Sequence, residues 1–510
     1  MTLEVLRQAA ALAFSIQTLL VVIAAAAFGM FVGAMPGLTA TMAVALLVPI
    51  TFFMDPVPAL SAIVAASGMA IYAGDIPGAL LRMPGTPASA AYVEDSHQLA
   101  LKGQLNLSLG TSLTVSAAGG LFGVAMLILF APILAEFALR FTSFEYFWLA
   151  TLGLSCAVFI AASDPLKAAV SLLIGLALST VGLDPASGAP RFTFGSIDLL
   201  AGVEFVPAMI GLFAIGEIMR GAIRLHAADP VPQVPPTRGS LFKGIGGIFR
   251  KYKKNILRSS ALGTLIGALP GSGADIAAWM AYAVSKRFSK TPDEYGKGSV
   301  EGLVDASSAN NAAVAGTWIP ALVFGIPGDS MTAIIIGVLY MKGMNPGPTV
   351  FLQRPQLIYA VFMIFIVTIL VMIPIGWLTV KAARNVLAVP RRVLLPMVLS
   401  FCIVGSFALT SSPFGIVLML AIGLFGWVLE DNGFPIAPII LGLILGGLFE
   451  RTFLTSMIKA NGDLLAFFER PIAASLGVFV FVVWGGALYG AIRAARKARA
   501  ARTASAANQP

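Results

Sequence analysis

Hydroxyl side chains follow each of four proline-glycine pairs that interrupt apolar sequence, and carboxylates follow the last two pairs. The pairs are Pro36-Gly37, Pro84-Gly85, Pro270-Gly271 and Pro327-Gly328. Proline removes a backbone donor and glycine adopts almost any backbone angle, so a helix ends at each pair and a new helix can begin behind it. The polar residues behind the pairs are Thr39 and Thr41, then Thr86 and Ser89, then Ser272 and Asp275, and finally Asp329, Ser330 and Thr332. These residue types cap the start of a helix, and their side chains also bind ligands.

A small organic anion is the ligand that a group of helix starts fits best. The first N–H groups of a helix have no partner within it, and together they carry about half a positive charge. In a membrane, interrupted backbone is tolerated only where protein buries it or a water-filled cavity receives it. The same side chains could instead only cap their helices, and this alternative stays open for each of them. The residues that we expect to contact the anion are Pro36, Gly37, Thr39, Thr41, Arg82, Gly85, Thr86, Ser89, Gly271, Ser272, Asn310, Asn311, Gly328, Asp329 and Ser330.

Two ionisable residues precede the break at Pro84. Asp75 and Arg82 are seven residues apart, about two turns of a helix, although Pro77 between them disturbs that geometry. An ionisable side chain at membrane depth is a functional candidate by default. Arg82 could bind a substrate carboxylate through two hydrogen bonds, and Asp75 could carry a coupling proton or ion. A buried structural pair, or an Arg82 that reaches the membrane surface, is the alternative.

Paired amides lie in a run of small, apolar residues between Ala306 and Gly316. Asn310 and Asn311 could bind an anion through their N–H groups or a sodium ion through their carbonyl oxygens. A hydrogen bond between helices is the alternative. The residues that we expect to couple transport to an ion are Asp75, Asp275 and Asn310.

Few other residues are candidates for metal binding or catalysis. Cys156 and Cys402 lie far apart in apolar windows and have no histidine close by in the sequence. We therefore expect no metal site, no disulfide and no cofactor, with Na⁺ or H⁺ as the coupling ion. His97 lies in a polar stretch, 92–104, that we expect to form a surface helix with the histidine on its solvated face.

The composition places these residues in a membrane protein. The chain has 510 residues, of which 58% are hydrophobic and 11% charged, and its mean hydropathy is +0.90. A soluble domain is nearer a quarter charged. Apolar windows of about 20 residues predict an all-α polytopic membrane protein, surrounded by membrane lipid, with about 12 membrane segments. Several segments are short or interrupted, so we expect some discontinuous or re-entrant helices.

Basic residues gather in three segments of the chain, whose net charge is +9. The loops 218–258 and 381–392 and the tail behind residue 492 are rich in Lys and Arg and almost free of acids. Short basic loops mark the cytoplasmic side of a membrane protein. We therefore place all three segments, including the C-terminus, in the cytoplasm and expect no nucleic acid partner.

The chain matches itself at a nearly constant offset. The matching stretches are 36–37 with 270–271, 76–85 with 319–328, and 207–216 with 438–447, at offsets of 234, 243 and 231 residues. Landmarks in the same order predict a duplication, although chance matches between Pro- and Gly-rich stretches are the alternative. Repeated halves with interrupted segments point to the binding site of a secondary transporter. We expect two repeated, inverted halves, namely a transmembrane repeat at 1–225, a basic Pro-containing cytoplasmic linker at 226–257, a second repeat at 258–492 and a disordered basic tail at 493–510.

Several stretches together resemble the large membrane subunit of the tripartite tricarboxylate transporter family, the TctA type. They are 33–39, 76–85, 178–185, 190–195, 203–207, 267–273, 309–313 and 325–329. No single motif is decisive, but the ordered set is specific. It extends from about residue 15 to about residue 490.

The resemblance implies a secondary active transporter, a permease of the bacterial cell inner membrane. It implies a small four-span membrane subunit and a periplasmic solute-binding protein as partners. It also implies an organic carboxylate, such as a tricarboxylate, as the substrate, taken up by symport with sodium ions or protons. The chain departs from the family at Asp75 and Arg82, where relatives commonly carry small or amide residues, which argues against an ordinary citrate specificity.

Two other functions remain open on the residues alone. A membrane-embedded enzyme such as an intramembrane protease would need paired aspartates, a Ser-His pair or H-E-x-x-H, and the last of these is absent. A solute channel is physically possible, although breaks in both halves suit a gated, alternately exposed site better. An ATP-driven pump would need a P-loop, which the sequence lacks. We expect a transporter without enzymatic activity.

Overall fold

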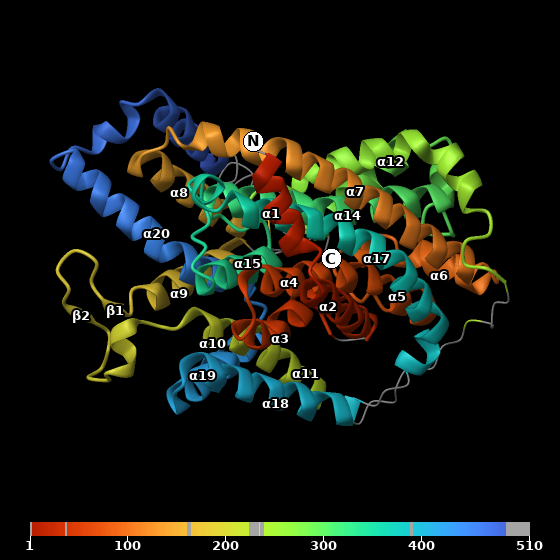
Figure 1. Cartoon of the computed structure of the whole chain (residues 1–510), viewed down its shortest axis with the longest axis horizontal. Coiled ribbons are helices and arrows are strands. Elements are labelled where there is room, and N and C mark those ends of the chain that lie inside the picture. The colour runs from red at the N-terminus through yellow and green to blue at the C-terminus, as the bar shows by residue number, and fades with distance from the viewer. Residues whose placement is uncertain are drawn as a thin grey trace, which may run out of the picture.

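The computed structural model describes residues 3–35, 38–160, 165–223, 234, 239–387 and 391–485, which are almost entirely helical (Figure 1). The α-helices are α1 (Leu3–Ala13), α2 (Ile16–Ala34), α3 (Ala40–Phe52), α4 (Pro56–Ala73), α5 (Asp75–Leu81), α6 (Val93–Leu101), α7 (Leu105–Ala138), α8 (Ser143–Ile160), α9 (Pro165–Ser179), α10 (Phe205–Ile210), α11 (Gly216–Ile223), α12 (Ile245–Gly267), α13 (Gly273–Phe288), α14 (Val300–Phe324), α15 (Ser330–Met341), α16 (Val350–Gln353), α17 (Pro355–Leu387), α18 (Arg391–Thr410), α19 (Pro413–Asp431) and α20 (Ala437–Lys459), with a further helix at Pro471–Gly485. The short elements are the 3-10 helices η1 (Ser89–Ala91), η2 (Asp198–Ala201), η4 (Pro292–Glu294) and η5 (Leu464–Phe468), the π-helical turn η3 (Gly211–Ile215) and the antiparallel strands β1 (Gly182–Leu183) and β2 (Pro190–Arg191).

Seven of the described helical stretches are long and apolar enough to cross a membrane. They are Ile16–Ala34, Pro56–Leu81, Leu105–Ala138, Phe205–Ile223, Pro355–Ala383, Pro413–Asp431 and Ala437–Lys459. Shorter apolar helices, among them α3, α9 and α15, lie between them. The predicted all-α, multi-pass membrane protein is therefore confirmed, whereas the number of spans and the division into two repeated halves stay predictions.

Glycines let α2 and α4 pack closely together. Gly29 and Gly33 of α2 face Ala66 and Ala70 of α4, and a Cβ added at either glycine would overlap the backbone of α4. At Gly33 that Cβ would lie only 2.7 Å from the Cα of Ala70. Small residues at such positions allow two helix backbones to approach each other within a membrane.

The same kind of contact joins α12 to α14. Gly263 and Gly267 of α12 face Ala309 and Ala313 of α14, and a Cβ added at Gly267 would lie 2.9 Å from the Cα of Ala313. Gly33 and Gly267 each stand three residues before a proline-glycine break. The helices in front of the first and third breaks thus make the same kind of contact.

The helices in front of the second and fourth breaks end in the same way. α5 is followed by Arg82 and α14 by Gly325, and both residues adopt the left-handed conformation, with φ of 57° and 69°. The N–H of Arg82 donates to the carbonyl oxygen of Gly78, and the N–H of Gly325 donates to that of Ala321. A left-handed residue closes a helix and turns the chain away from its axis.

The chain doubles back at the third break. α12 and α13 pack against each other, and the hydroxyl groups of Ser259 in α12 and Ser285 in α13 both donate to Asp305 of α14. The end of α13 therefore lies beside the middle of α12. The two helices thus form a hairpin, whereas its re-entry into a membrane stays a prediction.

The helices that start at the breaks lead to two different places. α3 and α15 end together, because Lys342 behind α15 donates to the carbonyl oxygens of Phe52 and Met54 at 2.7 and 2.6 Å. α6 ends instead beside the loop that follows α13, where Lys102 donates to the carbonyl oxygen of Lys297 at 2.7 Å. The breaks thus lie between two groups of helix ends.

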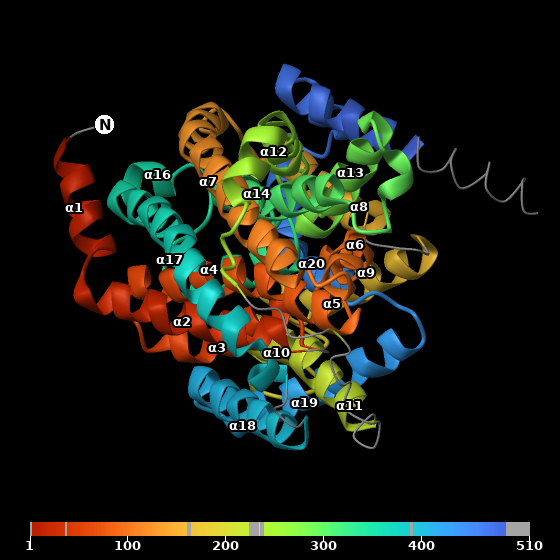
Figure 2. The same cartoon turned by 90° about the vertical axis from the view of Figure 1, so that its right-hand side faces the viewer.

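Helices far apart in the sequence also pair at the edges of the molecule. Gly175 of α9 faces Ile439 of α20, and Gly211 of η3 faces Met419 of α19, in both cases so closely that an added Cβ would overlap the opposite backbone. Figure 1 and Figure 2 both place α11, α18 and α19 together at one edge. These contacts join the N-terminal to the C-terminal part of the chain.

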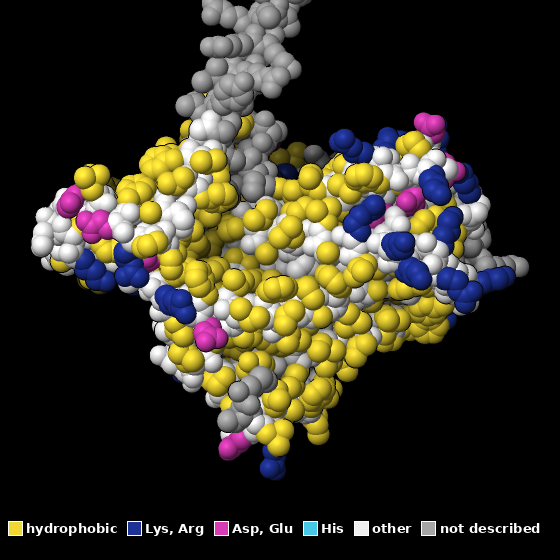
Figure 3. Space-filling model, turned by 90° about the horizontal axis from the view of Figure 1, so that it is seen from above, with side chains coloured by type: hydrophobic (Ala, Val, Ile, Leu, Met, Phe, Trp, Pro, Cys, Tyr) yellow, Lys and Arg dark blue, Asp and Glu magenta, His cyan; other side chains and the backbone are white. Residues whose placement is uncertain are grey.

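The surface separates charged from hydrophobic side chains. Figure 3 shows Lys and Arg gathered at the right-hand end, where Figure 1 places α12 and α6, and a smaller charged group at the left-hand end. Hydrophobic side chains dominate between them. The exposed basic residues of α12 and α13 are Arg250, Lys251, Lys253, Lys254, Lys286 and Arg287.

Candidate functional site

The polar residues behind the four breaks line two adjoining cavities. The first, of about 370 Å³, is lined among others by Thr39 and Thr86, and the second, of about 340 Å³, by Ser272 and Asp329. The residues that line both are Thr41, Pro87, Asp275, Ser330, Met331 and Ala437. We call the two together the break cavity. Every break contributes to it, although Pro36 and Gly37 themselves lie outside the described residues.

The helix starts at the break cavity are capped to different degrees. The Thr39 hydroxyl accepts from the N–H of Met42 at 3.1 Å. The Asp329 carboxylate accepts from the N–H of Thr332 at 2.7 Å, and the Thr332 hydroxyl accepts in turn from the N–H of Asp329, which is a capping box. Ser272 makes no side-chain cap of α13, so its hydroxyl is available to a ligand. Thr39 and Asp329 thus both cap a helix and line the cavity, whereas Ser272 only lines it.

Thr86 and Ser89 hold the second break in shape. The N–H of Ser89 donates to the Thr86 hydroxyl and the N–H of Thr86 donates to the Ser89 hydroxyl, both at 3.1 Å. Thr86 lines the break cavity, whereas Ser89 is buried and is absent from its described lining. Of these two predicted contact residues, only Thr86 reaches the cavity.

Asp275 connects the third break to the second. Its Oδ1 accepts from the N–H of Ala88 at 3.0 Å. One turn further along α13, the indole N–H of Trp279 donates to the carbonyl oxygen of Pro87 at 3.2 Å. A movement of α13 would therefore also displace the backbone at the second break.

The break cavity is lined by more acids than bases. Its carboxylates belong to Glu217, Asp275, Asp329 and Glu430, and Arg220 is the one base among the described lining residues. Arg220 forms ion pairs with Glu217 and Glu430. Asp275 and Asp329 have no such partner within the described chain, so a bound anion would need an accompanying cation or proton beside them.

Asp75 lies at the junction of α4 and α5 and is absent from the described lining of the break cavity. Its carboxylate accepts from the hydroxyl groups of Tyr92, at 2.6 Å, and Ser112. Asn310 donates to the Tyr92 hydroxyl at 3.4 Å. Two of the predicted ion-coupling residues thus share one buried cluster. The sequence singles out neither Tyr92 nor Ser112, because Ser112 is 37 residues from Asp75 and only the fold brings them together.

Arg82 points away from Asp75 and from the break cavity. Its side chain is 63% exposed and pairs with Glu94 of α6 at 2.7 Å. Hydrogen bonds from Gln98 and Arg82 hold the pKa of Glu94 below its usual value, against the opposing effect of its partial burial. Of the two alternatives for Arg82, the buried pair with Asp75 is therefore wrong, and the side chain reaches the surface.

His97 does not lie on a solvated face, so that prediction is wrong. The expected helix forms as α6, but it packs against α5 and α7. His97 is 9% exposed, and its Nδ1 lies 2.9 Å from the carbonyl oxygen of Ala79. The polar residues of α6 bind neighbouring segments. The polarity of the sequence alone does not distinguish such contacts from exposure to solvent.

The remaining predicted contact residues differ in whether they reach the break cavity. Gly85 packs on Gly74, and Gly328 packs on Thr317, with an added Cβ 2.6 Å from the Gly74 Cα and 2.8 Å from the Thr317 Cβ. Gly271 lines the break cavity. The Nδ2 of Asn311 is buried without a hydrogen-bond partner in the described part of the chain.

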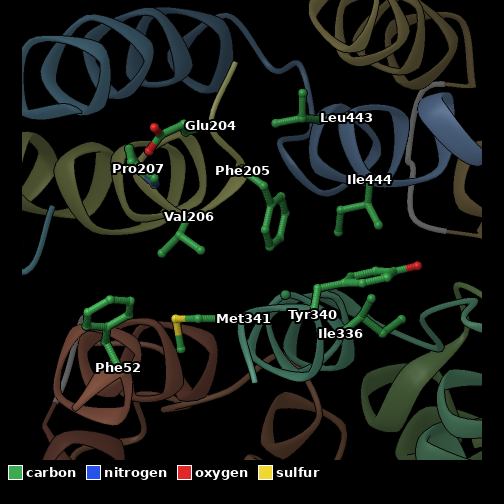
Figure 4. A pocket seen from close by; sticks show the side chains of 11 residues that line it. Phe52, Glu204, Phe205, Val206, Pro207, Ile336, Tyr340, Met341, Leu443 and Ile444 are labelled. Atoms are coloured by element: carbon green, nitrogen blue, oxygen red, sulfur yellow. The ribbon is translucent and has the colours of Figure 1, made fainter. Parts of the chain in front are cut away.

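A third cavity, of about 400 Å³, which we call the apolar cavity, lies beside the far ends of α3 and α15. Figure 4 shows Phe205 of α10, Tyr340 of α15 and Ile444 of α20 among its largely apolar lining. Glu204 is the one charged side chain in the lining that the structure describes. The ring of Phe205 packs on Gly337. Because four helices contribute to this cavity, no local sequence pattern predicts it.

Within the described ranges, no three His, Cys, Asp or Glu side chains gather as a metal site would require. Cys402 is a buried, free thiol.

The chain matches the model of the tripartite tricarboxylate transporter TctA family over residues 19–441. It belongs to this family. A protein of Agrobacterium vitis described as an uncharacterized 52.8 kDa protein in the TAR-I ttuC′ 3′ region is 34% identical over 454 residues, which cover 88% of each chain. A second protein of that organism, described as an uncharacterized protein in the TAR-II ttuC′ 3′ region, is 35% identical over 214 residues, 42% of this chain and 88% of its own. No solved structure matches the chain.

The family membership confirms the resemblance seen in the sequence. TctA is a transporter family, so this TctA-family protein is a transmembrane permease component of a tripartite tricarboxylate transport system. Its helices agree with that assignment, since seven of them can cross a membrane.

Proposed function

We propose that this TctA-family protein takes up an organic anion, a tricarboxylate or another carboxylate, across the bacterial inner membrane by secondary active transport. A sodium or proton gradient drives the uptake. A periplasmic solute-binding protein delivers the anion, and a small four-span membrane subunit completes the complex. The C-terminus lies in the cytoplasm.

The observation that carries this proposal is that residues behind all four breaks line two adjoining cavities with shared lining residues. Helix starts with free N–H groups attract an anion without a fixed cation that would hold it permanently. The hydroxyl groups of Thr39, Thr86 and Ser272 lie at the same cavity and can donate hydrogen bonds to carboxylate oxygens. The anion is therefore proposed to bind in the break cavity, with Arg82 outside the site.

A cation or proton accompanies the anion in this proposal. Asp275 and Asp329 would repel a carboxylate if both stayed ionised and unbalanced beside it. Binding of Na⁺ or H⁺ next to them removes that repulsion, so the anion binds well only together with its coupling ion. This is the thermodynamic requirement of a symporter.

Two repeated and inverted halves are part of the proposal. Its support is the recurrence of the Gly-Ala contact of α2 with α4 in that of α12 with α14, and of the helix end at Arg82 in that at Gly325. Each half contributes two breaks to the cavity. In inverted halves, a movement that opens the cavity to one side has a mirrored counterpart that opens it to the other.

An intramembrane aspartyl protease is the second candidate, because Asp275 and Asp329 line the same cavity. A protease would need two carboxylates that share a proton and activate a water molecule. Asp329 instead caps its own helix and Asp275 binds the backbone of Ala88. Both acids are thus engaged in holding the breaks, which favours the transporter.

Uptake into proteoliposomes tests the proposal. The ligand of the binding protein is first identified by thermal shift against di- and tricarboxylates. That compound, radiolabelled, is then offered to proteoliposomes that hold the full chain, the small subunit and the binding protein, with an inward sodium or proton gradient. Accumulation above the external concentration, lost when the gradient is collapsed, is the expected result. Equilibration at the same rate without a gradient would instead identify a channel.

A further inference from the structure

One buried carboxylate has no part in the anion site proposed above. Asp75 is 2% exposed and lies within the apolar stretch Pro56–Leu81 that can cross the membrane. Arg82, the nearest base in the sequence, pairs with Glu94 instead. Among the residues that the structure describes, Asp75 has no basic partner, and its hydrogen bonds come from Tyr92 and Ser112.

Two opposing effects act on the protonation of a buried carboxylate that has no basic partner. Burial in a low-dielectric interior disfavours the ionised carboxylate. Hydrogen bonds from Tyr92 and Ser112 to the ionised form offset part of that penalty. Asp305, which is equally buried, differs because Arg258 pairs with it at 3.1 Å.

The hydroxyl groups around Asp75 fit both of its protonation states. The ionised carboxylate accepts from Tyr92 and Ser112. The protonated form has to donate one hydrogen bond, and Ser112 can accept it, because the Ser112 oxygen lies 3.3 Å from the Ser307 hydroxyl and can turn its own hydrogen there. A proton can therefore bind and leave without displacing heavy atoms.

The surroundings of Asp75 favour a proton over a metal cation. A hard cation needs a shell of several oxygen ligands around an opening. Asp75 lines neither the break cavity nor the apolar cavity, and hydroxyl groups already occupy both of its oxygens. A proton needs only the carboxylate itself.

Asp75 is joined directly to the backbone that holds the second break. The carbonyl oxygen of Gly74 accepts from the N–H of Gly85 at 3.1 Å. A Cβ added at Gly74 would lie 2.8 Å from the methyl group of Thr86, which lines the break cavity. A change of charge at Asp75 therefore acts next to the anion site.

Other titratable groups around α5 are engaged elsewhere. The Tyr72 hydroxyl donates to the carbonyl oxygen of Leu109 at 3.4 Å. His97 binds the carbonyl oxygen of Ala79, and Glu94 pairs with Arg82. The carboxylate of Asp95 accepts from the backbone N–H groups of Gly296, Gly298 and Ser299.

We infer that Asp75, held by Tyr92 and Ser112, is a proton-binding site whose occupancy couples anion uptake to the proton gradient. The inference rests on the proposed function and adds to it the coupling residue, Asp75, and the coupling ion, H⁺. Asp75 takes up a proton when its cluster faces the outside and releases it when the cluster faces the cytoplasm. Tyr92 and Ser112 are positioning residues that set how tightly the proton binds.

Two transport measurements on the complete three-component system test the inference. Counterflow of the radiolabelled anion at equal pH needs the anion site but no net proton movement. Accumulation driven by an inward proton gradient in sodium-free buffer needs both the anion site and net proton movement. Asp75→Asn, which keeps the size and the neutral charge of the protonated acid but cannot release or bind a proton, is expected to keep counterflow and to lose accumulation at least about tenfold. Asp75→Glu is expected to restore part of it.

Glu94→Gln is the matched control, because it removes a carboxylate from the surface next to the same helix and should leave both measurements unchanged. Accumulation by Asp75→Asn at the wild-type level would overturn the inference. Loss of counterflow as well, in a protein that stays in the membrane, would also overturn it and make Asp75 a structural residue. A wild type without counterflow would overturn the proposed function and this inference with it.

Tyr92→Phe keeps the inference testable if Asp75→Asn does not fold. Phe removes a hydrogen bond that stabilises the ionised carboxylate, so the proton binds more tightly. The pH of half-maximal proton-driven uptake is expected to rise by about one unit. An unchanged pH profile would contradict the inference.

Discussion

Thr39 and Asp329 each serve two purposes, because the side chain that caps a helix also lines the break cavity. The Thr39 hydroxyl accepts from Met42, and its hydrogen remains free to bind a ligand. Asp329 neutralises part of the positive charge at the start of α15. Ser272, by contrast, makes no cap. Single residues thus differ in how much of their binding capacity is left for an anion.

The double substitution Thr39→Val and Ser272→Val is expected to abolish uptake while the protein stays in the membrane. Both side chains line the break cavity, and valine removes their hydroxyl groups. Radiolabelled uptake by whole cells, with an immunoblot of the membrane fraction, measures the effect. Thr39→Ser with Ser272→Thr keeps both hydroxyl groups and should retain uptake. Normal uptake by the valine variant would exclude these hydroxyl groups from the site.

Arg82→Gly is expected to leave uptake unchanged, because the side chain lies at the surface with Glu94. Its left-handed backbone, with φ of 57°, costs about 1–2 kcal/mol in a non-glycine residue, and an exposed ion pair offsets only about 0–1 kcal/mol of that. The melting temperature of Arg82→Gly should therefore equal or exceed that of the wild type, and that of Arg82→Ala should fall below it. A tenfold loss of uptake in both variants would instead show that Arg82 contributes to anion binding.

At the scale of helices, glycine contacts decide where the breaks lie. α2 and α12 each approach a partner helix so closely that alanine no longer fits, and each then ends at a break. The separation of these helices sets the position of the helix starts behind the breaks. The stability of the fold and the shape of the break cavity thus depend on the same contacts.

Gly263→Ala and Gly247→Ala, both in α12, are expected to have opposite effects. At Gly263 a Cβ would lie 2.7 Å from the Cα of Ala309, whereas at Gly247 nothing lies within 4 Å. Forcing two packed helices apart costs about 1–3 kcal/mol, but alanine in an open helical position stabilises by about 0.5–1 kcal/mol. Thermal unfolding of the purified protein measures both. Equal melting temperatures would show that the helices separate freely.

At the scale of the whole molecule, the break cavity lies between two groups of helix ends. α3 and α15 lead from it to Lys342, and α6 leads to the loop behind α13, next to the basic residues of α12 and α13. The apolar cavity lies on the side of Lys342, beside the ends of α3 and α15. The break cavity and the apolar cavity thus lie at opposite ends of α3 and α15.

Cysteines placed at Phe53 and Phe288 are expected to be labelled from opposite sides of the membrane. The two side chains are 75% and 70% exposed. Phe53 directly follows α3 and Phe288 is the last residue of α13, and these are corresponding helices of the proposed inverted halves. An impermeant maleimide on right-side-out and inside-out vesicles measures the sides, in a background without Cys156 and Cys402. Labelling of both from one side would contradict the inverted arrangement.

Much of this protein is already determined by its sequence. Apolar windows require membrane helices in any fold, and a proline-glycine pair interrupts a helix whatever surrounds it. For this reason the all-α class, the family and the residues at the breaks could be predicted. Local chemistry also indicates an anion wherever several helix starts gather. Of these steps, only the gathering of the helix starts depends on which segments are neighbours in space.

The tertiary structure alone decided which of those residues belong together. Thr39, Thr86, Ser272 and Asp329 line two adjoining cavities, and Gly-Ala contacts hold α2 against α4 and α12 against α14 next to them. The same packing turns Arg82 outward and leaves Asp75 inside with two hydroxyl groups that no local pattern connects to it. Side-chain direction and neighbours follow from contacts between distant segments, and in hydrocarbon those contacts depend on close backbone packing that polarity along the chain does not encode.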